Sequence, residues 1–109
     1  MSAIQEIIDL LIKFRNERNW EQFHNSKDLA LALSIEASEL IELFLWRSPE
    51  DVDVDKLKEE LADVFIFAFL LAKKHDLDVK DIIANKIKIN EKKYPLKKAR
   101  NSAKKYNEL

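Results

Sequence analysis

The chain has 109 residues, of which 47% are hydrophobic and 36% are charged, and it contains neither cysteine nor glycine. Without cysteine, a disulfide framework, a thiolate zinc site and a cysteine nucleophile are excluded. Without glycine, the Walker and Rossmann phosphate-binding loops are excluded, because both need glycine where backbone approaches phosphate. We expect one small domain over residues 1–109 in a reducing, cytoplasmic setting.

The charge is divided along the chain. Residues 1–85 hold 10 basic and 18 acidic side chains, whereas residues 86–109 hold 9 basic and 2 acidic ones. The longest uncharged run, Val64 to Ala72, is far shorter than the roughly 20 residues that span a membrane. The N-terminus lacks the basic and apolar regions of a signal peptide. An acidic body with a basic tail and no membrane contact is predicted.

The predicted elements begin with two helices. Apolar residues recur at helical spacing from Ile4, which predicts a first helix that ends near Asn19. Residues 20–25 have the pattern of a loop. Asn25 or Ser26 then caps a second helix, which we expect to run to about Trp46.

Two further helices follow. Ser48 and the Pro49 after it form a helix start signal with acidic residues behind them. A third helix is expected from Asp53 or Asp55 to Lys74. A fourth begins at residue 78 and stops before the Tyr94-Pro95 pair, because proline disfavours helix in the residue before it. Residues 95–109 stay unassigned, and no stretch alternates long enough to predict a strand. The fold class is therefore all-α, a bundle of four to five helices.

Two segments are apolar on nearly every side of a helix, namely residues 29–46 and 61–72. A helix that is apolar all round must be buried all round. A chain of this length cannot surround two such helices alone, since small domains bury only roughly 60% of their unfolded surface. We therefore predict a homo-oligomer with helices packed across subunits.

Two pairs of acids stand out because each projects from an apolar stripe. On a helical wheel, leucines and an alanine of the second helix lie within about 60° of Glu36, and so does Glu39. Apolar residues of the third helix surround Glu60 and Asp63 in the same way. Four converging carboxylates need a positive partner, and Mg²⁺ prefers such oxygen ligands. The alternative is that these acids lie on solvated faces or cap neighbouring helices.

A di-iron carboxylate bundle is the other metal centre to consider. It requires two Glu-x-x-His motifs, and only the segment from Glu21 to His24 matches one. We therefore do not expect di-iron.

The loop after the first helix carries Trp20, Phe23 and His24, and Trp46 lies at the far end of the second helix. Such aromatic side chains can form a platform on which a nucleobase stacks. The alternative is that Trp20 and Phe23 close the end of the bundle.

A basic face follows on the fourth helix. Lys86, Asn90 and Lys93 recur at helical spacing and are followed by Tyr94 and further basic residues. This face can hold the outer phosphates of a nucleotide. Generic solvation or weak polyanion binding is the alternative for such a tail.

The acid motif is E-x-x-E at Glu36 and Glu39, then 20 intervening residues, then E-x-x-D at Glu60 and Asp63. With it, the chain resembles the MazG-like nucleoside triphosphate pyrophosphohydrolases, and within them most closely the dCTP pyrophosphatases. The resemblance also rests on the segments NWEQFH (19–24), LALALSIEASELIELFLW (29–46), EELADV (59–64) and KYPLKKAR (93–100).

The resemblance implies an all-α enzyme, assembled as a dimer or as a dimer of dimers. It would hydrolyse the α–β phosphoanhydride of a nucleotide with Mg²⁺, leaving monophosphate and pyrophosphate. The four acids become catalytic metal ligands, and the aromatic loop with Trp46 contacts base and sugar. The dCTP pyrophosphatases place His where this chain has Leu11 and Tyr where it has Phe67, in the nucleoside pocket. The preferred base is therefore left open.

Two alternative functions remain at this point. One is a dUTPase or a broad house-cleaning pyrophosphatase for modified nucleotides. The other is a non-catalytic helical oligomer that binds nucleic acid or a protein through its basic tail. We expect a nucleotide as the substrate and do not expect a nucleic acid partner.

Overall fold

A computed structural model describes residues 2–109, and within them every regular element is a helix. The all-α prediction is thus confirmed. The chain divides into two compact units, one ending at Leu77 and the other comprising Asp78–Leu109, and each is described by itself. The single domain that we expect over residues 1–109 stays a prediction.

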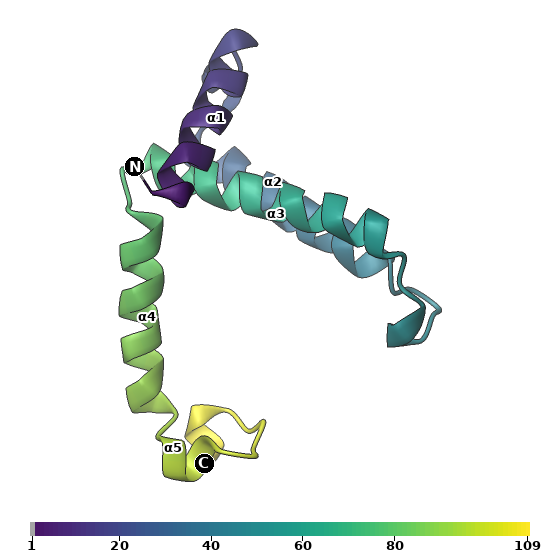
Figure 1. Cartoon of the computed structure of the whole chain (residues 1–109), viewed down its shortest axis with the longest axis vertical. Helices are drawn as coiled ribbons and strands as arrows, with labels where there is room; N and C mark the ends of the chain where they lie inside the picture. The colour runs from purple at the N-terminus through teal and green to yellow at the C-terminus, as the bar shows by residue number, and fades with distance from the viewer. Residues whose placement is uncertain (1) are drawn as a thin grey trace. The chain divides into compact units, whose positions relative to one another are not determined.

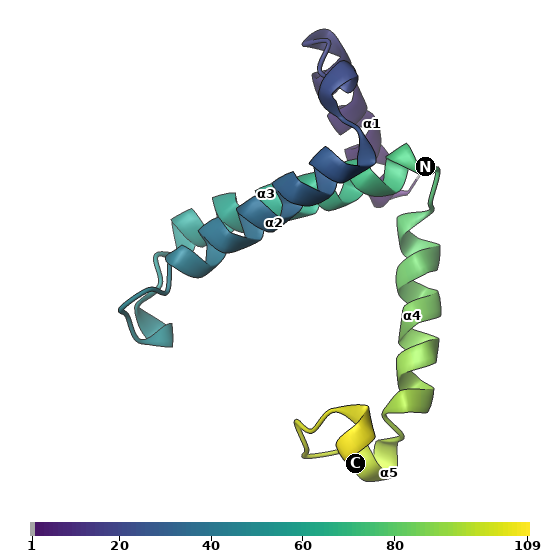
Figure 2. The same cartoon turned by 180° about the vertical axis from the view of Figure 1, so that it is seen from behind.

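The first unit contains three long helices, α1 (Ala3–Glu17), α2 (Ser26–Glu42) and α3 (Val54–Lys74). Two 3-10 turns join them, η1 (Glu21–Phe23) and η2 (Pro49–Asp51). The helices α2 and α3 lie side by side along most of their length (Figures 1 and 2). Because a short connection reverses the chain between them, they run antiparallel.

The expected capping residues begin these helices. The side chain of Asn25 accepts a hydrogen bond from the backbone N–H of Asp28 at 2.8 Å. Asp53 accepts from the N–H groups of Asp55 and Lys56 at 3.1 and 3.3 Å. The predicted starts of α2 and α3 are therefore confirmed. The start signal at Ser48 yields only the short turn η2, in which its hydroxyl donates to Asp51.

Two helix ends show how a chain without glycine stops a helix. Asn19 and Asp76 have positive φ values of 53° and 52°. After α1, the N–H of Trp20 donates to the carbonyl of Arg15 and that of Asn19 to the carbonyl of Asn16. The same pair of bonds follows α3. This is the Schellman arrangement, in which asparagine or aspartate replaces the usual glycine.

The predicted end of the second helix is wrong by four residues. The helix α2 ends at Glu42 and not at Trp46. Its last turn tightens, because the N–H groups of Leu43, Phe44 and Leu45 each donate to the carbonyl three residues earlier. Trp46 then takes a positive φ of 59° and reverses the chain. Apolar periodicity continues through such a turn, so it could not reveal this end.

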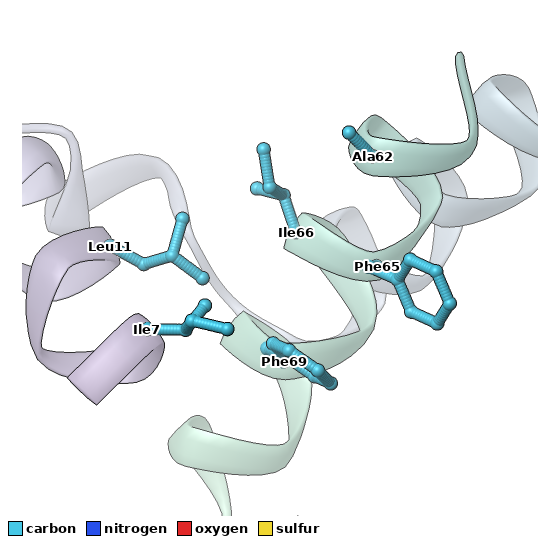
Figure 3. A pocket seen from close by; sticks show the side chains of 6 residues that line it. All are labelled: Ile7, Leu11, Ala62, Phe65, Ile66 and Phe69. Atoms are coloured by element: carbon cyan, nitrogen blue, oxygen red, sulfur yellow. The ribbon is translucent and has the colours of Figure 1, made fainter. Parts of the chain in front are cut away.

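The core of the first unit is small. Ile8, Leu29, Leu70 and Ala72 are buried. Beside them, α1 and α3 enclose an open apolar cavity of about 390 Å³. Figure 3 shows Ile7 and Leu11 of α1 pointing toward α3, whose side of the cavity is formed by Ala62, Phe65, Ile66 and Phe69.

The second unit contains α4 (Val79–Lys93), the single turn α5 (Leu96–Ala99) and the 3-10 turn η3 (Tyr106–Glu108). Asp78 caps α4 by accepting from the N–H of Asp81 at 2.9 Å, and the helix stops before Tyr94. Both predicted ends of this helix are confirmed. Among the helices of residues 2–109, none is long and apolar enough to cross a membrane.

Candidate metal centre

Carboxylates from two helices meet in the first unit. Glu36 of α2 and Glu60 and Asp63 of α3 each offer an oxygen, and these atoms lie within 4.8 Å of one another. Glu39 is close to them, because its carboxyl group contributes to raising the pKa values of both Glu36 and Glu60. The structure therefore brings together all four acids of the two sequence motifs.

The helix geometry explains this meeting. Residues three apart in a helix lie on one face, so each motif presents two acids in the same direction. The helices α2 and α3 run antiparallel and pack along their length. A pair from each helix then reaches the same place, and all four side chains are half-buried.

The cluster is electrostatically strained. Burial, the interaction with the Glu39 carboxyl and the nearby acidic charges raise the pKa of Glu36 to about 7. The same causes, with burial the largest, raise the pKa of Glu60. In both residues the Oε2 atom is buried and has no hydrogen-bond partner within residues 2–109.

No basic side chain of the described residues relieves this charge. The two ion pairs of residues 2–109 lie elsewhere, between Arg15 and Glu21 at 3.4 Å and between Lys27 and Asp28 at 3.9 Å. Unpartnered buried oxygens and uncompensated negative charge are what a divalent cation with hard oxygen ligands would satisfy. The cluster could therefore bind a metal ion.

The aromatic loop is at the N-terminal end of α2. The ring of Trp20 packs edge-on against Phe14, with ring centroids 5.7 Å apart, whereas Phe23 is 62% exposed. The Nδ1 atom of His24 is buried and finds no partner among the described residues. Burial and the charges of Arg15 and Lys74 lower the pKa of His24, against an opposing effect of Glu21. The ring of Phe23 is thus accessible to a ligand, whereas the Nδ1 atom of His24 is a buried polar atom without a partner among the described residues.

Trp46 lies apart from this loop. The 17 residues of α2 separate Trp46 from His24, which corresponds to roughly 25 Å along the helix axis. Trp46 is 94% exposed. Within one chain, the structure therefore does not bring Trp46 together with the aromatic residues of the loop.

Leu11 and Phe67, the two departures seen in the sequence, lie on different helices, α1 and α3. Phe67 is half-buried and follows Asp63 by four residues, which places it on the acidic face. Leu11 instead lines the apolar cavity with Phe65 and Phe69. The two positions therefore have different surroundings in this chain.

The predicted basic face belongs to the second unit. Lys86, Asn90 and Lys93 lie on α4, and Tyr94 is its C-cap, with its N–H donating to the carbonyl of Asn90 at 2.8 Å. The expected helical spacing of the three residues is thus present. Their binding of phosphates stays a prediction.

Sequence reasoning missed two polar features near the aromatic loop. Arg15 occupies a position of the apolar stripe of α1, and its side chain is only 13% exposed. Its charge lowers the pKa of His24. A charged residue at such a position was the available signal. Ser26 Oγ and His75 Nε2 lie 2.8 Å apart, joining the start of α2 to the end of α3. No local pattern could indicate that contact.

Residues 31–109 match the model of the MazG-like family. The chain belongs to the MazG-like family. This MazG-like chain is 38% identical to human dCTP pyrophosphatase 1 in an alignment of 115 positions. The alignment covers 98% of this chain and 68% of that protein. The mouse protein of the same name is 37% identical over the same shares of both chains.

A solved structure is similar as well. The crystal structure of a pyrophosphatase from Archaeoglobus fulgidus matches this MazG-like chain with a TM-score of 0.81 and 33% sequence identity. The match covers 87% of this chain and 94% of the archaeal one. The helical fold is therefore shared with a solved relative.

Proposed function

We propose that this MazG-like chain is a nucleoside triphosphate pyrophosphohydrolase that cleaves the α–β phosphoanhydride of dCTP or a modified dCTP. The products are the nucleoside monophosphate and pyrophosphate. The observation that carries the proposal is the meeting of Glu36, Glu60 and Asp63, with Glu39 close by. Two buried carboxylate oxygens of this cluster have no hydrogen-bond partner among the described residues. The mammalian relatives named dCTP pyrophosphatase support the substrate.

The metal in this proposal is Mg²⁺, held by Glu36, Glu39, Glu60 and Asp63. When bound, it supplies positive charge beside the triphosphate and the departing pyrophosphate. The helices α2 and α3 hold the carboxylate oxygens in place. Because the four side chains are half-buried, little water surrounds them. Glu36 or Glu39 accepts the proton of the attacking water.

The nucleoside contacts come from the aromatic loop and from α3. Trp20, Phe23 and His24 contact base and sugar, with Phe67 on the acidic face of α3. The exposed ring of Phe23 supports this assignment. So does the buried Nδ1 of His24, which has no hydrogen-bond partner among the described residues. In the second unit, Lys86, Asn90, Lys93 and Tyr94 contact the outer phosphates.

A second copy of the chain completes the site in this proposal. Trp46 and the aromatic loop are at opposite ends of α2, so one nucleoside can contact both only if they come from different subunits. Large apolar side chains also stay exposed on α2 and α3, including Leu31, Ile35 and Phe65. A homo-oligomer, as a dimer or a dimer of dimers, would cover them. The cytoplasmic setting expected from the lack of cysteine belongs to the same proposal.

A broad house-cleaning pyrophosphatase or a dUTPase is the second candidate. The observation that favours it is the loss of polar atoms at Leu11 and Phe67, since Leu11 lines an entirely apolar cavity. Fewer polar contacts to a nucleoside mean weaker discrimination between bases.

Product analysis tests both candidates. The purified protein is incubated with each dNTP, with 5-modified dCTPs and with dUTP, with and without Mg²⁺, and products are separated by chromatography. Magnesium-dependent release of monophosphate and pyrophosphate, fastest for cytosine nucleotides, is the expected result. Equal rates for many bases would favour the house-cleaning enzyme. No turnover of any nucleotide would overturn the enzymatic proposal and favour a binding protein that acts through its basic tail.

A further inference from the structure

Residues 101–109 fold back toward the end of α4. Asn101 has a positive φ of 64°, which reverses the chain after α5. Figures 1 and 2 show this C-terminal segment, in yellow, returning beside α5. The only aromatic residue of the segment is Tyr106, at the start of η3. The fold-back brings this ring to the last residues of α4.

Tyr106 contacts two neighbouring residues there. The Nζ atom of Lys93 lies 4.9 Å from the centre of the Tyr106 ring, over its face. The rings of Tyr94 and Tyr106 meet edge-on, with centroids 6.2 Å apart and planes at 85°. An ammonium over an aromatic face and a T-shaped ring pair are both attractive arrangements. Tyr94 thus supports the Tyr106 ring, and that ring holds Lys93.

We propose that Tyr106 is a positioning residue that holds the Lys93 ammonium ready for the phosphates of the nucleotide. The inference rests on the proposed function, in which Lys93 contacts those phosphates. A lysine side chain has many rotamers, and restricting them before binding reduces the entropy lost on binding. The ring covers one side of the ammonium, which leaves N–H donors for phosphate oxygens.

The test compares two substitutions of the ring. Tyr106→Leu removes the aromatic face and keeps an apolar side chain, so the KM for dCTP should rise roughly two- to fivefold at unchanged kcat, the range of an exposed cation–π contact. Tyr106→Phe keeps the face and should retain the KM of the parent protein. An unchanged KM in Tyr106→Leu would overturn the proposal. A lowered KM would overturn it too, because the ring would then compete with phosphate.

Two further variants separate positioning from other roles. In a Lys93→Met background, Tyr106→Leu should leave KM unchanged, because the ring has no ammonium to hold. Additive effects would instead assign Tyr106 a purely structural role and overturn the proposal. Lys105→Gln removes a neighbouring charge and keeps the ring, so it should have little effect. If Lys105→Gln raised the KM as much as Tyr106→Leu does, the charge of the tail, and not the ring, would explain the change in KM.

Binding of inorganic triphosphate, measured by calorimetry on the full chain, gives a readout that does not require turnover. Tyr106→Leu should weaken it by the same two- to fivefold, and Tyr106→Phe should not. If the parent protein hydrolyses no nucleotide but this difference is found, the proposed function fails and the positioning role stands. If the parent protein hydrolyses dCTP but Tyr106→Leu binds triphosphate as tightly as the parent protein does, the positioning role alone fails.

Discussion

The two faces of α3 are opposite in chemistry and alike in being incomplete. One face brings Glu60 and Asp63 to the acids of α2, where buried oxygens have no partner within the described residues. The other face lines an open apolar cavity with Phe65 and Ile66. The first lacks positive charge and the second lacks apolar cover. A single helix thus carries both the face proposed to hold a cation and the face proposed to pack against a second copy.

Removing charge from the acidic face should have the largest effect. Glu36→Gln and Asp63→Asn each remove a proposed metal ligand, so magnesium-dependent turnover should fall at least about a hundredfold. Replacing a residue that only supports a metal ligand already lowers metal affinity or activity roughly 10- to 100-fold. Both variants should stay folded, because they relieve repulsion among the acids. Steady-state kinetics and circular dichroism measure the two effects.

The matched control for these variants is Glu42→Gln, which changes an exposed acid of α2 one turn from Glu39. Its turnover should match that of the parent protein. Normal turnover in both Glu36→Gln and Asp63→Asn would show that the acidic face is not the metal centre.

A charge on the apolar face should have an intermediate effect. Phe65 is 52% exposed, and Phe65→Asp would place a carboxylate where a second copy is proposed to pack. Burying an unpaired charge is costly, so association should weaken at least about tenfold. Sedimentation velocity over a concentration series measures it. Phe65→Leu keeps the surface apolar and should remain associated. An unchanged oligomer in Phe65→Asp would exclude this face from the interface.

The pH dependence of the metal-free protein should show the smallest effect. The pKa of Glu36 lies at about 7 in the folded chain, above its ordinary value of 4.5. The folded state therefore binds the proton more tightly, and stability is lost as pH rises from about 4.5 through 7. Partial exposure to water keeps the effect modest. Thermal melts in chelator between pH 4.5 and 8 measure it.

Glu36→Gln is the control for this pH series, because glutamine does not titrate. In this variant the melting temperature should fall less as the pH rises. Added Mg²⁺ should raise the melting temperature more at pH 8 than at pH 5, since the cation replaces a proton at low pH. A metal-free protein whose stability rises with pH over this range, in both the parent chain and Glu36→Gln, would contradict the assigned pKa.

Local signals predicted much of this structure. Caps at Asn25, Asp53 and Asp78 act through their own neighbours, so the helix starts could be recognised. The carboxylate cluster could also be anticipated, because two motifs on apolar stripes must face inward. The end of α2 could not, since a tightened last turn keeps the same apolar pattern. The contact of Ser26 with His75 depends on tertiary packing, which no local pattern records.

The loop at Trp46 has a consequence for how stability and function trade against each other. A residue with a Cβ at positive φ carries a steric cost of about 1–2 kcal/mol, and asparagine and aspartate bear it most easily. Three of the four such positions in residues 2–109 are asparagine or aspartate, and the fourth is Trp46. Glycine there would relax the backbone and delete the ring. The isolated chain would become more stable by losing the side chain that its partner subunit is proposed to use.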